Sequence, residues 1–188
     1  TLSLSGVQMS EEVTYLEIPK EPEIEGITFH KYTSQSEINE FKRINDRMLS
    51  EAYSVYTYHY FVDQNPDITY SARNENGEMI GMCICKKDMQ GRRPVGYIGM
   101  LSVIPEYRGR GIAKALAIRC INAMIRLRFS ECYLETEIDN IGALNLYEGL
   151  GFRRTEYLVR YYQNGNSAYR LLLQLEDVYF PMIDEYWT

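Results

Sequence analysis

The chain has 188 residues, 45% of them hydrophobic, and a formal net charge of −6. This length suits one domain with its own core. The acidic balance gives no sign of nucleic-acid binding by this chain alone, because proteins that bind nucleic acid carry clustered basic residues. No apolar stretch is long enough to cross a membrane and no signal peptide is evident, so we expect no membrane contact.

The cysteines do not indicate a disulfide framework or a metal centre. They are Cys83, Cys85, Cys120 and Cys132. Cys83 and Cys85 lie two positions apart in an apolar run, so on a strand they share a face and do not easily bridge. The chain has only two histidines and no Cys/His spacing typical of zinc. We therefore expect reduced cysteines, no metal and a cytoplasmic location.

The predicted elements follow an acidic extension, residues 1–25, which is rich in glutamate. We expect this extension to lie outside the core, either disordered or along a surface. Residues 27–31 are predicted to form a strand. A capping-box pattern at Ser34 and Glu37 then precedes apolar residues at helical spacing, which predict a helix to about Leu49.

The next segment, residues 50–61, is rich in tyrosine and predicts a bend followed by a short helix. Strands are expected over 68–73 and 79–87, because Asn76-Gly77 between them is a hairpin signal. A loop is expected over 88–95, which contains a glycine and a proline.

A buried strand is predicted from Tyr97 to Ile104, and Pro105 ends it because proline lacks the N–H that a ladder needs. The following helix has a buried stripe that reaches Leu127. Residues 131–138 alternate as a strand, so their odd-numbered side chains share one face.

Asn140 is a good N-cap for a helix that ends near Gly149 or Gly151. A long strand over 152–162 and another over 168–175 complete the pattern, whereas residues 176–188 fit no predicted element. Because this order alternates strands with helical crossovers, we expect a single α/β domain with a mixed sheet.

The turn between the buried strand and its helix carries the clearest functional signal. Gly109 and Gly111 allow a tight turn and a close approach of backbone N–H groups to a ligand. The helix start adds unpaired N–H groups and a positive dipole end, and Arg108 and Arg110 add charge, so an anion such as diphosphate is expected there. A Walker loop is excluded because no Gly-Lys-Ser/Thr follows, and a Rossmann fingerprint fits badly.

This turn resembles the acetyl-CoA motif of the GNAT acetyltransferase superfamily, Arg/Gln-x-x-Gly-x-Gly/Ala. The resemblance implies one GNAT domain over 26–176, with a mixed central sheet of about seven strands and four main helices, followed by a tail at 177–188. It also implies acetyl-CoA as cosubstrate and CoA as product. The residues expected to hold acetyl-CoA are Met100, Leu101, Val103, Arg108, Gly109, Arg110, Gly111, Ile112, Ala113, Asn140 and Tyr147.

Acetyl transfer to an amine needs a base and a proton donor for the departing thiolate. Glu135 is predicted as the base, because a mid-strand carboxylate among apolar neighbours is costly unless it is used or paired. Glu137 shares its face and stays the alternative. Tyr147 lies two turns from Asn140 on one helix face; the GNAT resemblance brings its hydroxyl near the sulfur and lets Tyr97 hold a catalytic water.

Several further blocks resemble the catalytic subunits of NatC-type N-terminal acetyltransferases: SEAYSVYTYHYF, GYIGMLSV, YRGRGIAKAL, LETEIDNIGALNLYEGLGF and VRYYQNGNSAYRL. The resemblance implies acetylation of nascent chains that begin with Met and a bulky apolar residue, and auxiliary subunits that link the enzyme to the ribosome. It assigns the peptide groove to Glu51, Tyr53, Tyr97, Tyr161 and Tyr162. Ala52 departs from the family's usual proline, so the bend around it is expected to be looser.

Two alternatives stay open. The first is a GNAT enzyme that acts on other N-termini or on lysine, although two hairpin tyrosines favour a closed groove and a lysine amine needs a stronger base. The second is a CoA-binding subunit without activity, against which the presence of Glu135, Asn140 and Tyr147 argues.

Overall fold

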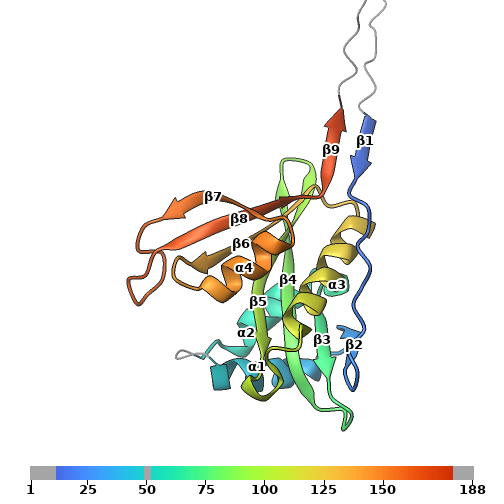
Figure 1. Cartoon of the computed structure of the whole chain (residues 1–188), viewed down its shortest axis with the longest axis vertical. Helices are drawn as coiled ribbons and strands as arrows, with labels where there is room; N and C mark the ends of the chain where they lie inside the picture. Colours follow the sequence, from blue (N-terminus) through green and yellow to red (C-terminus); the bar gives the residue numbers. More distant parts are fainter. Residues whose placement is uncertain (1–11, 49–51, 180–188) are drawn as a thin grey trace, which may run out of the picture.

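The computed structural model describes residues 12–48 and 52–179 (Figure 1). Seven strands form one sheet in the spatial order β2-β3-β4-β5-β6-β8-β7, and four α-helices accompany them among the described residues. The strands are β2 (Thr28–Lys31), β3 (Tyr70–Arg73), β4 (Met79–Gln90), β5 (Arg93–Val103), β6 (Glu131–Glu137), β7 (Arg153–Leu158) and β8 (Ala168–Gln174). The helices are α1 (Glu37–Met48), α2 (Val55–Val62), α3 (Ile112–Arg126) and α4 (Ile141–Gly149), with 3₁₀ turns η1 (Pro66–Ile68) and η2 (Pro105–Tyr107).

The sheet is mixed, as the sequence predicts. Only the pair β5–β6 is parallel, and the other neighbouring strands are antiparallel. Helix α3 makes the crossover between the two parallel strands, because parallel neighbours cannot be joined by a tight turn. The expected α/β fold is therefore confirmed.

The sheet has a helix pair and a core on each side. On β4, Cys83 and Cys85 face the cluster built with α3 and α4, while Met82 and Ile84 face the cluster built with α1 and α2. Alternate residues of a strand point to opposite faces, so one buried strand supplies both cores. All four cysteines are free and buried; the sulfurs of Cys83, Cys85 and Cys120 lie within 4.8 Å of one another in apolar surroundings. Burial raises the pKa of Cys85, so the uncharged thiol packs there as a small hydrophobe.

The segment that precedes β2 is hydrogen-bonded to α3. Strand β1 (Glu12–Tyr15) pairs with β9 (Glu176–Tyr179), so segments near the two ends of the chain lie side by side (Figure 1). Arg119 on α3 donates to the carbonyl of Pro22 at 2.9 Å, and Asn122 donates to that of Pro19 at 2.9 Å. Residues 16–25 therefore lie along a surface of the domain, while residues 1–11 fall outside the described range.

Strands β1 and β9 form where the sequence predicts no strand, and the strand expected over 68–73 begins only at Tyr70. Two further boundaries differ more strongly from the prediction. Residues 88–95 are not a loop: β4 and β5 continue as a hairpin whose turn is at Gly91, with φ of 61°. Pro94 pairs with Met89 near the tip of this hairpin, where a missing N–H costs little. The predicted strand 152–162 ends at Leu158, because the chain leaves the sheet and Arg160 adopts a positive φ of 48°.

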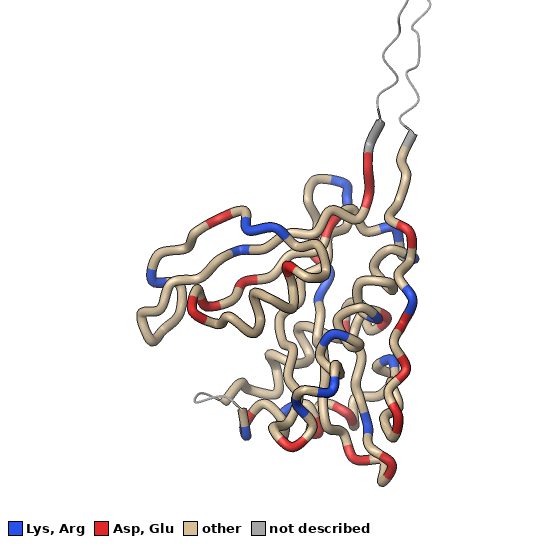
Figure 2. Tube along the Cα trace, in the orientation of Figure 1, with Lys and Arg blue, Asp and Glu red and all other residues tan. Residues whose placement is uncertain are grey.

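Charges of both signs are interspersed along the chain (Figure 2). Many form ion pairs with residues far away in the chain, as in Arg73 with Glu40 at 2.8 Å and Arg93 with Glu176 at 2.7 Å. None of the described helices is long and apolar enough to span a membrane.

Candidate active site

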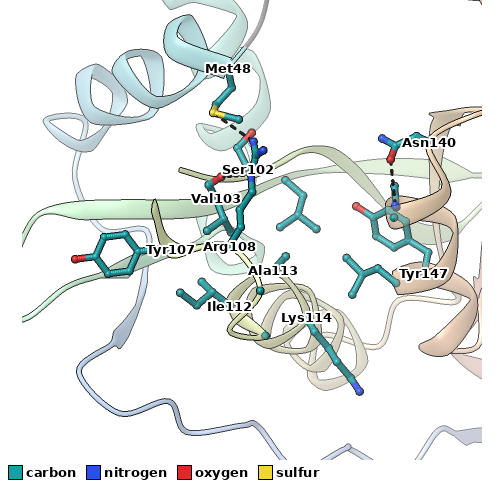
Figure 3. A pocket seen from close by; sticks show the side chains of 16 residues that line it. Met48, Ser102, Val103, Tyr107, Arg108, Ile112, Ala113, Lys114, Asn140 and Tyr147 are labelled. Atoms are coloured by element: carbon teal, nitrogen blue, oxygen red, sulfur yellow. Dashed lines mark hydrogen bonds between the residues drawn. The ribbon is translucent and has the colours of Figure 1, made fainter. Parts of the chain in front are cut away.

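A pocket with a volume of about 810 Å³ opens where β5 meets the turn before α3, opposite the start of α4 (Figure 3). Its wall combines strand backbone, two turn glycines and one face of a helix. The lining residues are Met48, Leu101, Ser102, Val103, Tyr107, Arg108, Gly109, Gly111, Ile112, Ala113, Lys114, Asn140, Gly142, Ala143, Leu146 and Tyr147.

The opening exists because β5 and β6 separate. They pair only from Val95 to Tyr97 of β5. On the other side of β5, Ile84 opposes Met100 while Cys85 opposes Ile98, so Gly99 is the extra residue of a β-bulge. A Cβ on Gly99 would lie 2.1 Å from Cε1 of Phe61, so only glycine fits this close contact. The bulge thus lies directly before Met100.

Beyond the bulge, part of the β5 backbone faces the opening. The Ile104 N–H donates to the Ile80 carbonyl of β4 at 2.9 Å. Because alternate residues direct their backbone groups to opposite sides, those of Leu101 and Val103 point away from β4. The Val103 carbonyl accepts from Arg108 Nε at 3.1 Å, and the Leu101 N–H is directed toward the pocket.

The turn before α3 is an open cradle of backbone. Gly109 and Gly111 have φ of 75° and 80°, and a Cβ on either would meet no atom within 4 Å. Gly111 is the N-cap and supplies no side-chain cap to the first N–H groups of the helix. These donors and the helix dipole therefore make the cradle attractive to an anion such as a diphosphate.

Asn140 and Tyr147 form the α4 wall of the pocket (Figure 3). The Asn140 side chain caps the helix by accepting the Ala143 N–H at 3.2 Å. Tyr147 packs edge-on against Phe152, and its burial raises the pKa of its hydroxyl well above the usual value. The hydroxyl is therefore protonated at neutral pH and can donate.

Most of the residues predicted to bind the cofactor line this single pocket, but two do not. The Met100 side chain lies on the opposite face of β5 and accepts from Asn45 at 3.1 Å. Arg110 stacks over the Tyr107 ring, 4.9 Å from its centroid. Sequence reasoning missed seven of the lining residues, which are Met48, Ser102, Tyr107, Lys114, Gly142, Ala143 and Leu146. Of these, Ser102, Tyr107, Lys114 and Leu146 directly adjoin predicted positions.

A second group of residues gathers on the sheet where β5 and β6 are still paired. The Tyr97 ring stacks on Phe61 from α2 at 6.1 Å and lies 4.9 Å from Tyr133 of β6. Burial, and then the nearby Glu135 carboxylate, raise the pKa of Tyr97 well above its usual value. The Tyr97 hydroxyl thus stays protonated beside the carboxylate.

Glu135 and Glu137 share one face of β6 but differ in their partners. The Glu135 side chain is 5% exposed, and its Oε1 accepts from Arg170 Nη2 at 2.9 Å. Its Oε2 is buried and has no hydrogen-bond partner among the described residues. The two oxygens of Glu137 accept from Asn166 at 3.1 Å and from Asn164 at 3.5 Å. Glu135 therefore keeps an available acceptor, whereas Glu137 anchors the turn between β7 and β8.

The predicted groove tyrosines border this group. The rings of Tyr161 and Tyr162 are 5.1 Å apart at 87°. Burial raises the pKa of Tyr162, and the nearby Tyr161, Glu135, Glu137 and Tyr53 add to the shift. Tyr53 packs edge-on against Tyr58 and lies close enough to Tyr162 to contribute to its raised pKa. The predicted Glu51 lies outside the described residues.

Residues 38–152 match the family model described as Acetyltransferase (GNAT) family. The chain is 44% identical over 149 residues to N-alpha-acetyltransferase 30 of Saccharomyces cerevisiae, covering 77% of this chain and 85% of the relative. The relative of the same name from Schizosaccharomyces pombe is 41% identical over 148 residues, covering 78% and 97%. A crystal structure of the NatC complex bound to Gag peptide and CoA contains a chain with a TM-score of 0.76 and 42% identity, covering 79% of this chain and 98% of that one.

The fold is that of an acetyl-CoA-dependent acyltransferase. The chain belongs to the GNAT acetyltransferase family and, within it, to the N-alpha-acetyltransferase 30 group of NatC-type N-terminal acetyltransferases. Acetyl-CoA is therefore the cosubstrate, as the sequence predicts.

Proposed function

We propose that this enzyme acetylates the α-amino group of chains that begin with Met followed by a bulky hydrophobic residue. The observation that carries the proposal is Oε2 of Glu135, which is buried and has no hydrogen-bond partner in the part of the chain that the structure describes. The aromatic residues Tyr97, Tyr161 and Tyr162 lie near it. The rings offer apolar surface for such side chains, and their hydroxyls suit hydrogen bonds to a peptide backbone.

Acetyl-CoA is proposed to enter through the pocket between β5 and α4. The cradle at Gly109 and Gly111 binds the diphosphate through backbone N–H groups. The separated edge of β5 pairs with the pantetheine arm, and the Leu101 N–H is directed to where the thioester oxygen becomes negative.

The proposed reaction is a direct attack of the amine on the thioester carbon. A C–N bond forms and the C–S bond breaks. The amine gives its proton through one water, held by Tyr97, to Oε2 of Glu135. An α-amino group has a pKa near 7.7–8.0, so a carboxylate base suffices. Tyr147 acts on the departing thiolate as acid or hydrogen-bond donor. The thiolate ends as a thiol, and the proton it gains is balanced by the one that Glu135 took from the amine.

We further propose that the chain acts with auxiliary subunits, and through them at the ribosome in the cytoplasm. One similar solved structure is itself a NatC complex, which supports this assembly. The net charge of −6 and the interspersed charges favour ribosome contact through a partner rather than through nucleic acid or membrane contacts of this chain.

A peptide panel tests this function. The purified chain, alone and with auxiliary subunits, is given acetyl-CoA and peptides beginning Met-Leu, Met-Ala, Ser-Glu or Met-Glu, together with an N-blocked peptide that contains lysine. We expect selective acetylation of Met-Leu. Acetylation of lysine alone would overturn the closed groove, and no activity in either preparation while acetyl-CoA binds would indicate a non-catalytic subunit.

A further inference from the structure

We propose that Arg170 is a positioning residue for the reaction: it holds Oε1 of Glu135 and turns the carboxylate so that only Oε2 faces the amine. This inference rests on the proposed role of Glu135 as base. Arg170 acts through Glu135 and itself touches neither substrate.

The contacts of Arg170 are asymmetric. Both Nη2 and Nε donate to Oε1 of Glu135, at 2.9 and 3.2 Å, and neither donates to Oε2. An arginine often binds a carboxylate with one donor on each oxygen. Here the arginine occupies one oxygen and leaves the other as an acceptor, which is the arrangement a base needs.

The register of the sheet fixes this arrangement. Arg170 of β8 is paired directly with Glu135 of β6 and, on its other side, with Glu156 of β7. Its Nη1 donates to Glu156 at 3.0 Å. The Glu135 side chain is 5% exposed, whereas that of Glu156 is 53% exposed. One guanidinium thus bridges a buried and an exposed carboxylate across three strands.

The surroundings of Glu135 explain why it needs this cation. Facing it are Tyr97 of β5, Tyr133 of β6, Tyr161 and Tyr162 of the loop before β8, and Arg170 of β8, with Glu137 on the same face of β6. Among the described residues, Arg170 is the one cation in ion-pair contact with it. A buried charge is costly unless it is paired and hydrogen-bonded, so this contact is what holds the carboxylate in one orientation.

The test compares two changes of Arg170 with a matched control. Arg170→Gln removes the charge, and Arg170→Lys keeps it while losing the fixed planar geometry. Arg154→Gln is the control, because Arg154 lies on β7 of the same hairpin and pairs with the exposed Glu148 at 2.6 Å. For each variant, kcat and KM for a Met-Leu peptide are measured against pH, together with the Kd of acetyl-CoA.

We expect Arg170→Gln to lower kcat by about 10²-fold at every pH, with little change in the peptide KM, because a displaced base loses its alignment with the amine. Arg170→Lys should lower kcat by a smaller factor, because it keeps the charge on Oε1 without the fixed planar geometry. Arg154→Gln should reproduce the parent profile, and the Kd of acetyl-CoA should be the same in all variants.

Unchanged kcat in Arg170→Gln would overturn the inference, as would a loss confined to the peptide KM. If Arg170→Gln does not fold, Arg170→Lys decides alone: lowered kcat with an unchanged peptide KM supports the role, and any other result contradicts it. The parent enzyme separates the two proposals. If it acetylates no peptide even with auxiliary subunits, the proposed function fails; if it is active while the variants behave like it, only the role of Arg170 fails.

Discussion

The pocket in which acetyl-CoA is proposed to bind and the Glu135 region are built in different ways. Most of the lining residues of the pocket come from one continuous stretch, in which β5, the glycine turn and the start of α3 follow one another between Leu101 and Lys114. The Glu135 region is made of side chains from α2, β5, β6, β8 and the loop before β8. A backbone site tolerates changes of side chain, whereas a side-chain site depends on each residue and on the packing that holds it.

The largest expected effect is on the side-chain site. Glu135→Gln removes the proposed base, so kcat should fall by about 10²–10⁴-fold. The Kd of acetyl-CoA should not change, because the cradle at Gly109 and Gly111 is separate. Steady-state kinetics and calorimetric binding check both numbers, and unchanged turnover would remove Glu135 as the base.

The next largest effect is expected at Gly99, where β5 packs closely against Phe61 of α2. Gly99→Ala places a Cβ only 2.1 Å from Cε1 of Phe61, which is far inside the normal contact distance. Overpacking of this kind costs about 1–3 kcal/mol, so the free energy of unfolding should fall by that amount. Thermal or urea unfolding measures it. Gly77→Ala is a comparison without a clash, because a Cβ there meets no atom within 4 Å, although its positive φ of 77° still carries strain.

A smaller effect is expected at the rim of the groove. Tyr161 is 46% exposed, and we place it against the peptide rather than at the thioester. Tyr161→Ala should raise the peptide KM about tenfold, equivalent to about 1.4 kcal/mol of binding free energy, with little change in kcat. A loss confined to kcat would instead place Tyr161 at the chemistry.

The smallest effect is expected at the other glutamate of β6. Glu137→Gln keeps one carbonyl acceptor for the Asn164 and Asn166 amides and loses at most one hydrogen bond, worth about 0.5–1.5 kcal/mol. The enzyme should be slightly less stable, with kcat within the same order of magnitude as the parent. If kcat drops as far as in Glu135→Gln, the two glutamates share the role of base.

The pocket could be predicted from sequence because its signals are local. The glycines before α3, the cap at Asn140 and the spacing of Asn140 and Tyr147 act within one turn or one helix, and the structure brings them to a single cavity. The side chains of Met100 and Arg110 lie elsewhere because a motif specifies the path of the backbone and not the direction of each side chain.

The choice between Glu135 and Glu137 could not be made from the sequence. The alternation of β6 puts both on one face, and nothing near them in the chain distinguishes them. The difference comes from Arg170 and from two asparagines of the turn after β7. Their positions depend on the pairing of β6 with β8, which brings together residues that are more than thirty positions apart in the chain.

The sequence by itself determined the fold class, the family and most of the residues that line the pocket in which acetyl-CoA is proposed to bind. These depend on periodicity, on glycines that permit a positive φ and on a helix start, and all act over a few residues. Only the tertiary structure decided which glutamate of β6 keeps an oxygen without a partner among the described residues, which cation pairs with that glutamate and which aromatic rings lie beside it. Ion pairs and ring contacts join residues far apart in the chain, so the register of the strands and the packing of α2 on β5 must exist before they form.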